Sequence, residues 1–340
     1  MTAFRSDDCI SVAIHRTAQP AEFAASLRRS FEQRRIDPKF HYTSARQASE
    51  WLALHKKYSP FIKAADGTAV YDAAFDWAVD HLPEGAVQLL SLACGGAGKE
   101  LRLVKALQRA GKAVSATVSD ISVPLVLEGF QMLTRDAGLT GVKAVALDLL
   151  ETEALEAVLT AGAGQGIPRV VTCFGLMPNV DPRLISAQLA SLVRPGDVLL
   201  VGANLVPADN YEQSTHAVLG EYDNPETRGW LSLLLADCGF EPGDGEIRFA
   251  VEPCASLPEL LQIVGRYHLH RDKAISLDGR ALNFSAGENL RLFFSNRYTP
   301  ALLKQVFARA KMKIPGEWIS AGKTEGVIAC QIMASPGDNR

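Results

Sequence analysis

A glycine-rich segment, SLACGGAGKE (residues 91–100), joins an apolar run typical of a buried strand to a run with helical spacing. At such a junction the backbone N–H groups can approach a ligand, and α/β proteins often bind nucleotides there. The segment does not fit a P-loop, because Ala93 stands at the first glycine and Glu100 at the magnesium-binding hydroxyl. It also departs from the dinucleotide fingerprint, because Leu101 occupies the position of the third small residue.

Two acidic residues follow this segment at the ends of the next two predicted strands. Asp120 ends the second strand, where a carboxylate can accept hydrogen bonds from both hydroxyls of a ribose. Asp148 ends the third strand, where it can reach the amino group of an adenine. Loop glycines and helix-capping aspartates are the alternative for each residue taken alone. The ordered set instead favours the cofactor loop of a class I methyltransferase, which holds S-adenosylmethionine at the carboxyl edge of a parallel sheet.

The elements that would position these residues alternate between strand and helix from residue 86 onward. Expected strands cover residues 86–93, 112–120, 142–148, 169–176 and 197–206. Expected helices cover residues 99–111, 122–138, 150–162 and 181–196. Apolar strands joined by helices predict a parallel sheet with helices on both faces, and therefore an α/β protein with a Rossmann-like sheet.

The alternation stops after Pro207. An apolar helix (230–240) is followed by strand-like runs at residues 246–253, 260–270 and 280–295 with no helix between them. Consecutive strands of this kind pair antiparallel, which predicts a smaller α+β part. A helix (299–312) and two strands (317–322 and 326–333) close the chain, and residues 1–60 are expected to be helical and outside any strand–helix unit.

Composition and charge exclude several classes of protein. Lys plus Arg number 35 and Asp plus Glu 38, so no excess charge points to nucleic acid or an anionic membrane as partner. No apolar stretch approaches the roughly 20 residues that cross a bilayer, and the N-terminus does not resemble a signal peptide. The six cysteines form no CxxC pair, which predicts reduced thiols in a cytoplasmic protein. His268 and His270 lack a third ligand, so no metal site is expected.

Several segments taken together resemble the histidine-specific N-methyltransferase family, whose members methylate the α-amino group of histidine in ergothioneine biosynthesis. They extend over nearly the whole chain and are DPKFHYTS, LACGGAGKELRLVKAL, SDIS, FGLMPNVDPR, LVRPGDVLLVGANLV, EYDNPET and LNFSAGENLRLFFSNRYT. The last segment is the most specific. The resemblance implies a methyltransferase domain that binds S-adenosylmethionine, made of residues 61–206 and 298–340, and a substrate-binding domain made of residues 1–60 and 207–297.

The resemblance also implies which residues form the two parts of the site. The implied cofactor residues are Gly95, Lys99, Asp120, Asp148, Leu149 and Gly175. The implied acceptor residues are Tyr42, Tyr58, Asn179, Tyr222, Phe293 and Ser295, with Asn179 on the carboxylate or amine of an amino acid. Tyr42 and Tyr222 are the expected catalytic residues. They would orient the acceptor amine, because an in-line displacement on a sulfonium methyl group mainly needs positioning.

Three positions depart from the family pattern. Ser91 and Ala93 replace the acid and the first glycine of the cofactor loop, and Phe293 replaces the glutamate that binds imidazole, while Ser295 is kept. Loss of that glutamate should cost a histidine substrate about 1.5–3 kcal/mol of binding free energy. The expected activity is therefore N-methylation of the α-amino group of a small amino-acid-type acceptor other than free histidine.

Two other functions remain open from the sequence. An S-methyltransferase acting on a methionine-like amino acid would carry almost the same residues. A protein that binds S-adenosylmethionine without catalysis would tolerate the changes at Ser91 and Ala93. In each case the chain is expected to be a monomer or a homodimer.

Overall fold

A sheet of eight strands forms the larger part of the molecule. The computed structural model describes residues 9–63, 66–162, 164 and 166–332. The strands lie in the order β1 (Val12–Ile14), β4 (Val142–Ala146), β3 (Ala113–Asp120), β2 (Ala86–Leu92), β5 (Arg169–Phe174), β6 (Val198–Asn204), β13 (Glu325–Ile332) and β12 (Met312–Ile319). Pairing is parallel from β1 to β6, and β13 is antiparallel to both β6 and β12. The connections reverse direction between β2 and β5, where an open α/β sheet has its ligand crevice.

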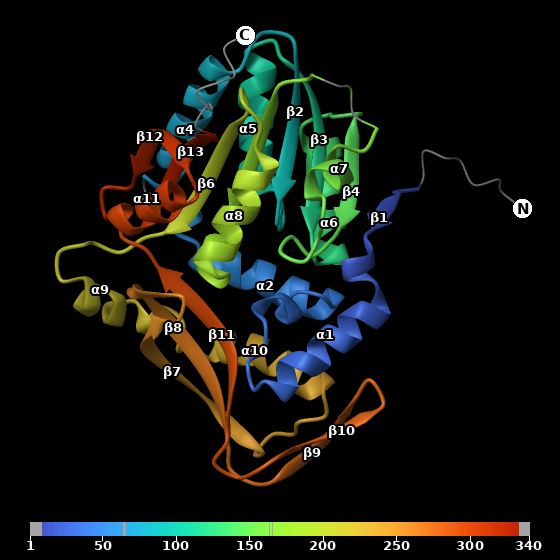
Figure 1. Cartoon of the computed structure of the whole chain (residues 1–340), viewed down its shortest axis with the longest axis vertical. Helices are drawn as coiled ribbons and strands as arrows, with labels where there is room; N and C mark the ends of the chain where they lie inside the picture. The colour runs from blue at the N-terminus through green and yellow to red at the C-terminus, as the bar shows by residue number, and fades with distance from the viewer. Residues whose placement is uncertain (1–8, 64–65, 163, 165, 333–340) are drawn as a thin grey trace, which may run out of the picture.

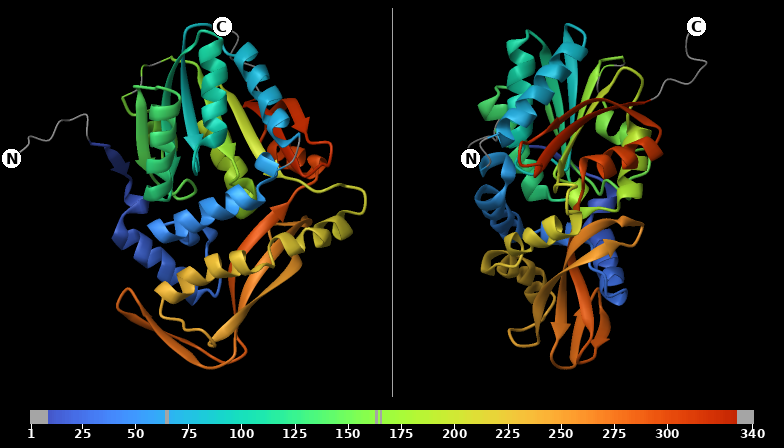
Figure 2. Two further views of the ribbon diagram at one scale, coloured as in Figure 1. Left: turned by 180° about the vertical axis from the view of Figure 1, so that it is seen from behind. Right: turned by 90° about the vertical axis from the view of Figure 1, so that its left-hand side faces the viewer.

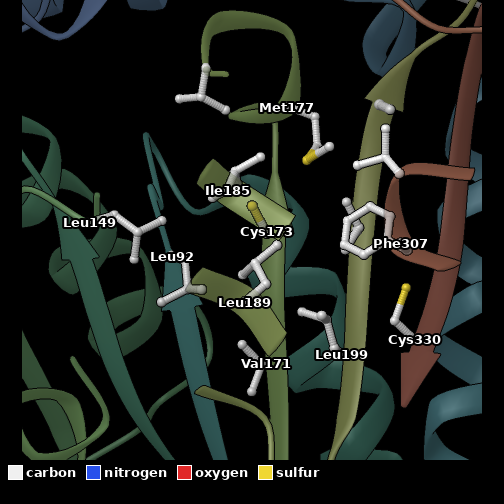
Figure 3. Packing of buried hydrophobic residues seen from close by; sticks show 14 of the residues in the cluster. Leu92, Leu149, Val171, Cys173, Met177, Ile185, Leu189, Leu199, Phe307 and Cys330 are labelled. Atoms are coloured by element: carbon white, nitrogen blue, oxygen red, sulfur yellow. The ribbon is translucent and has the colours of Figure 1, made fainter. Parts of the chain in front are cut away.

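Helices cover both faces of this sheet (Figure 1). One face packs on α4 (Gly67–His81), α5 (Gly98–Arg109) and α6 (Val123–Gln131), the last followed by a π-helical turn (Met132–Asp136). The other face packs on α7 (Leu155–Thr160), α8 (Pro182–Leu192) and α11 (Pro300–Arg309). Figure 3 shows Ile185 and Leu189 of α8 against Val171 and Cys173 of β5. The predicted α/β class and Rossmann-like sheet are confirmed.

A smaller sheet lies beyond the carboxyl ends of the parallel strands (Figures 1 and 2). It contains β11 (Asn289–Arg297), β8 (Leu257–Leu269) and β7 (Gly245–Cys254), all antiparallel, beside a hairpin of β9 (Lys273–Leu277) and β10 (Arg280–Phe284). The chain reaches it through α9 (Tyr211–Ala217) and α10 (Pro225–Asp237), which are joined by a 3-10 turn at Leu219–Glu221.

The N-terminal segment packs with this smaller sheet. It contains 3-10 turns at Arg16–Ala18 and Pro38–His41, and the helices α1 (Pro20–Glu32), α2 (Ala45–Tyr58) and α3 (Pro60–Lys63). Phe31 of α1 and Phe40 share one buried apolar cluster with Trp230 of α10 and Phe293 of β11. Segments far apart in the sequence, from before β2 and after β6, therefore form one hydrophobic core.

Some elements differ from those predicted. Residues 12–14 form β1 at the edge of the large sheet, although residues 1–60 were expected to lie outside any strand–helix unit; three mostly exposed residues carry no readable alternation. The helix expected at 299–312 ends at Arg309, because Lys311 adopts a left-handed φ of 60° and the chain turns into β12. The helix expected at 150–162 begins only at Leu155. β9 was not predicted.

The cysteines agree with the expected reduced, mostly buried thiols. Within the described residues all six are free, and only Cys9 is exposed. None of the described helices is long and apolar enough to cross a membrane.

Candidate functional site

The glycine-rich segment forms the turn between β2 and α5 at the carboxyl edge of the large sheet. Ala93, Gly95 and Ala97 all have positive φ values, of 50°, 51° and 51°. Ala93 therefore adopts a left-handed backbone conformation. This conformation is less favourable for alanine than for glycine by roughly 1–2 kcal/mol. A Cβ on Gly95 would lie 3.0 Å from the Trp51 ring, so the ring of this α2 residue covers the loop closely.

Asp120 connects this loop to the end of β3. Its carboxylate accepts hydrogen bonds from the Gly95 N–H at 3.2 Å and the Ser122 N–H at 3.0 Å. Burial raises the pKa of Asp120 to about 6, and these backbone donors oppose that increase. A carboxylate has about four acceptor positions, so backbone donors leave room for hydroxyl groups of a ligand. Asp120 thus lies at the end of β3, as predicted, and its binding of a ribose stays a prediction.

Asp148 lies just beyond β4 and is held by a residue that the sequence did not suggest. The ammonium group of Lys39, from the 3-10 turn at residues 38–41, lies 2.5 Å from one carboxylate oxygen. The other oxygen accepts from the Leu150 N–H at 3.0 Å. Leu149 packs into the hydrophobic core of the large sheet.

Next to Lys39 is a pocket of about 180 Å³. It is lined by Arg16, Thr17, Glu22, Phe23, Ser26, Lys39, Ile121 and Glu151.

A buried acid, Glu100, lies beneath the loop. It is 2% exposed, and one of its oxygens accepts hydrogen bonds from the hydroxyls of Ser91 and Thr172, both at 3.1 Å. Burial raises the pKa of Glu100, while the backbone, Ser91 and Thr172 donors lower it. Glu100 thus brings a carboxyl group into contact with Ser91 of β2. Sequence spacing gave no signal for this pairing.

The Lys99 side chain points into a cluster between α4 and the first residue of β13. Its ammonium group donates to the Tyr71 hydroxyl at 2.7 Å and lies 3.5 Å from a Glu325 carboxylate oxygen. It also lies over the rings of Phe61, Tyr71 and Phe174. Gly175, the other predicted loop residue, follows β5 with a φ of 100°.

Tyr222 contacts three residues of β11 that face the same way. Phe293, Ser295 and Arg297 share one side because side chains alternate along a strand. The Tyr222 ring lies 5.8 Å from the Phe293 ring, and its hydroxyl lies 3.0 Å from the Ser295 hydroxyl. The Arg297 guanidinium donates a hydrogen bond to the same Tyr222 hydroxyl. The structure thus brings together three residues predicted for the acceptor and adds Arg297, which strand alternation from Ser295 would have indicated.

Aromatic rings connect the loop to this part of β11. Trp51 lies against Tyr42 at 5.5 Å between ring centroids, Tyr42 against Trp230 at 5.3 Å, and Trp230 against Phe293 at 6.1 Å. Burial raises the pKa of Tyr42, and the negative charge of Asp120 raises it further. Tyr42 is therefore a neutral phenol at physiological pH. Its hydroxyl can orient a ligand by hydrogen bonding.

The two remaining predicted residues make separate contacts. The Asn179 amide donates to the backbone carbonyl of Phe294 at 2.7 Å, which fixes it beside β11. The Tyr58 hydroxyl, at the end of α2, donates to Glu226 of α10 at 3.3 Å. His268 contacts Asn289, and in the described part of the chain no group of side chains has the composition of a metal site.

Comparison with known proteins was made at the level of sequence and of structure. No protein-family model matches the chain, and no curated protein matches it. Mitomycin 7-O-methyltransferase MmcR is similar at 12% identity and a TM-score of 0.42, over 93% of this chain and 70% of that one. Magnesium protoporphyrin IX methyltransferase from Synechocystis, with bound SAH, is similar at 12% identity and a TM-score of 0.43, over 86% and 97%. An amino pentose methyltransferase from Micromonospora echinaspora, with bound SAM, has 12% identity and a TM-score of 0.39, over 76% and 89%.

Proposed function

We propose that this chain is an S-adenosylmethionine-dependent methyltransferase that methylates the α-amino group of a small amino-acid-type acceptor other than free histidine. The observation that carries the proposal is the Asp120 carboxylate, buried and bound to the backbone N–H of Gly95. This hydrogen bond joins the glycine-rich turn after β2, several of whose residues have positive φ values, to the carboxylate at the end of β3. Both lie near the gap between β2 and β5, where the strand connections reverse direction. A nucleoside whose ribose hydroxyls are free could donate hydrogen bonds to this carboxylate.

The residues present fit the cofactor. Asp120 would accept hydrogen bonds from the ribose hydroxyls, and its hydrogen bond from the Gly95 N–H places the glycine-rich turn next to that carboxylate. We propose that the adenine lies in the pocket lined by Ile121, Lys39 and Glu151, beside Asp148, whose carboxylate pairs with Lys39. When bound, S-adenosylmethionine supplies a methyl group on a positive sulfur, which is already activated for in-line displacement.

The acceptor is proposed to lie along the aromatic residues between Trp51 and Phe293. Tyr42 and Tyr222 would orient its amine, since a phenol can both donate and accept a hydrogen bond. Burial among aromatic rings disfavours an ammonium ion and favours the neutral amine, whose lone pair attacks. We also propose the two domains that the resemblance implies. Residues 61–206 and 298–340 would bind the cofactor, and residues 1–60 and 207–297 would bind the acceptor.

The proposed cofactor site should depend on pH through Asp120. Burial raises the pKa of Asp120 to about 6, so its carboxylate is ionised above that pH and protonated below it. The affinity for S-adenosylhomocysteine should therefore fall as the pH is lowered through about 6, by up to about tenfold per pH unit. Titration calorimetry from pH 5 to 8 checks this. The Asp120→Asn variant should bind weakly with a flat profile, and an equally steep profile in that variant would exclude Asp120 as the titrating group.

Phe293 is proposed to set the preference against histidine. Its side chain is buried between the rings of Tyr222 and Trp230. Phe293→Glu should shift kcat/KM toward histidine relative to an apolar amino acid by about 1.5–3 kcal/mol, roughly 10- to 150-fold. Phe293→Leu is the matched control, which should lower activity on both without favouring histidine. An unchanged ratio in Phe293→Glu would remove Phe293 from the specificity site.

The activity itself is tested with the purified protein, S-adenosylmethionine and a pool of free amino acids. Products with one, two or three added methyl groups are detected by mass spectrometry. If only the thioether of a methionine-like acceptor gains a methyl group, the S-methyltransferase alternative holds, and the proposed amine acceptor is wrong.

A further inference from the structure

Arg297 is a buried cation that forms no ion pair with the carboxylates the structure describes. Its side chain is 4% exposed at the end of β11. Within the described residues its guanidinium forms no ion pair with a carboxylate, and its Nε atom has no hydrogen-bond partner. It donates a hydrogen bond to the Tyr222 hydroxyl and lies 4.9 Å from the centroid of the Tyr222 ring. The negative charges of Glu221 and Glu325 raise the pKa of Arg297 from a distance. Glu325 already pairs with Lys99 and accepts a hydrogen bond from the Tyr71 hydroxyl.

A second buried arginine, Arg169, is by contrast paired with carboxylates. Arg169 is 1% exposed and forms ion pairs with Asp197 and Glu156. Burial raises the cost of every unpaired charge, so buried arginines are normally matched by carboxylates in this way. At Arg297 burial lowers the pKa to about 10, with Glu221 and Glu325 acting against this only at longer range. Arg297 therefore remains charged at neutral pH and has no counter-ion in the described part of the chain.

The position of Arg297 relates this charge to the acceptor residues. Phe293, Ser295 and Arg297 follow each other on one side of β11, and all three contact Tyr222. Asn296, on the opposite side, is used structurally, since its amide donates to the carbonyls of Met177 and Val180. The side toward Tyr222 thus changes from aromatic at Phe293, through a hydroxyl at Ser295, to a cation at Arg297.

We propose that Arg297 binds a carboxylate of the acceptor, while the neighbouring Tyr222 hydroxyl orients its amine and Phe293 contacts its apolar side chain. This inference rests on the proposed function and adds the residue that selects a carboxylic acid over a neutral amine. A guanidinium matches the planar carboxylate. A phosphate would carry up to two charges into an aromatic environment that offers one cation, so a carboxylate is the better fit.

The test compares acids with their amides. L-phenylalanine, L-tryptophan, L-leucine and L-methionine, and the four carboxamides, are titrated by calorimetry into protein saturated with S-adenosylhomocysteine. At least one acid should bind the unaltered protein ten times or more tightly than its amide. Arg297→Met should lose that preference, and Arg297→Lys should keep part of it. Arg291→Met is the matched control on the same strand and should retain the full preference.

Thermal unfolding without an acceptor separates a binding role from a structural one. Arg297→Met should not lower the melting temperature, because it removes an unpaired buried charge, whereas Arg169→Met should lower it strongly by leaving Asp197 unpaired. Equal binding of acids and amides, binding of none of them, a preference retained in Arg297→Met, or a loss of stability as large as in Arg169→Met would each overturn the inference. Failure of S-adenosylhomocysteine to bind the unaltered protein would instead contradict the proposed function itself.

Discussion

Replacing Asp120 by alanine should abolish tight binding of S-adenosylhomocysteine. The variant removes the two proposed hydrogen bonds from the ribose hydroxyls to a charged acceptor, each contributing about 1.5–3 kcal/mol. It also releases the Gly95 N–H that this carboxylate holds in place. A total loss of about 3 kcal/mol or more corresponds to an affinity on the order of a hundredfold weaker. Titration calorimetry at pH 8, where Asp120 is ionised, measures the loss directly.

Asp181→Ala is the matched control for this variant. Asp181 caps α8 by accepting hydrogen bonds from the N–H groups of Arg183 and Leu184, so its loss should cost about 1 kcal/mol of folding stability. The affinity for S-adenosylhomocysteine should not change. If Asp120→Ala bound as tightly as the unaltered protein, the cofactor site would have to lie elsewhere.

Replacing Gly95 by valine should damage both the fold of the loop and cofactor binding. A left-handed φ of 51° costs a β-branched residue roughly 1–2 kcal/mol, and the new side chain meets the Trp51 ring, which adds about 1–3 kcal/mol of overpacking. The combined change of about 2–5 kcal/mol should lower the melting temperature and the affinity for S-adenosylhomocysteine together. Denaturant unfolding and calorimetry on the same preparation measure the two effects.

Gly98→Ala serves as the control for the loop. Gly98 begins α5 without a positive φ, and a Cβ there would meet nothing within 4 Å. Alanine should therefore be neutral or slightly stabilising in this helix. If Gly98→Ala impaired cofactor binding as much as Gly95→Val, then contact between α5 and the ligand, and not the Gly95 backbone, would be the controlling feature.

The large sheet was predictable from the sequence because its strands are unbroken apolar runs separated by amphipathic helices. That pattern placed Asp120 at a strand end correctly and put Asp148 within two residues of one. The smaller sheet was predictable in class because strand-like runs follow one another after Pro207 without a helix between them, although the run expected at 280–295 is divided between β10 and β11. β1 and β9 were missed because three to five residues carry too little periodicity.

The contacts that complete the site were less predictable, because they join residues far apart in the sequence. Lys39 reaches Asp148 across 109 positions, and Tyr222 reaches Ser295 across 73. The pairing of Glu100 with Ser91 and Thr172 depends on how α5 packs on β2 and β5. Arg297 lies two residues beyond the strand predicted at 280–295, at the end of β11. That it forms no ion pair with any of the described carboxylates can be seen only when all its neighbours are in place.

The most direct test of the central claim is mass spectrometry of the purified protein incubated with S-adenosylmethionine and a pool of free amino acids. We expect S-adenosylhomocysteine to form together with an amino acid, other than histidine, that has gained one or more methyl groups on its α-amino nitrogen. If S-adenosylmethionine is not consumed and no amino acid gains a methyl group, the proposed activity is contradicted.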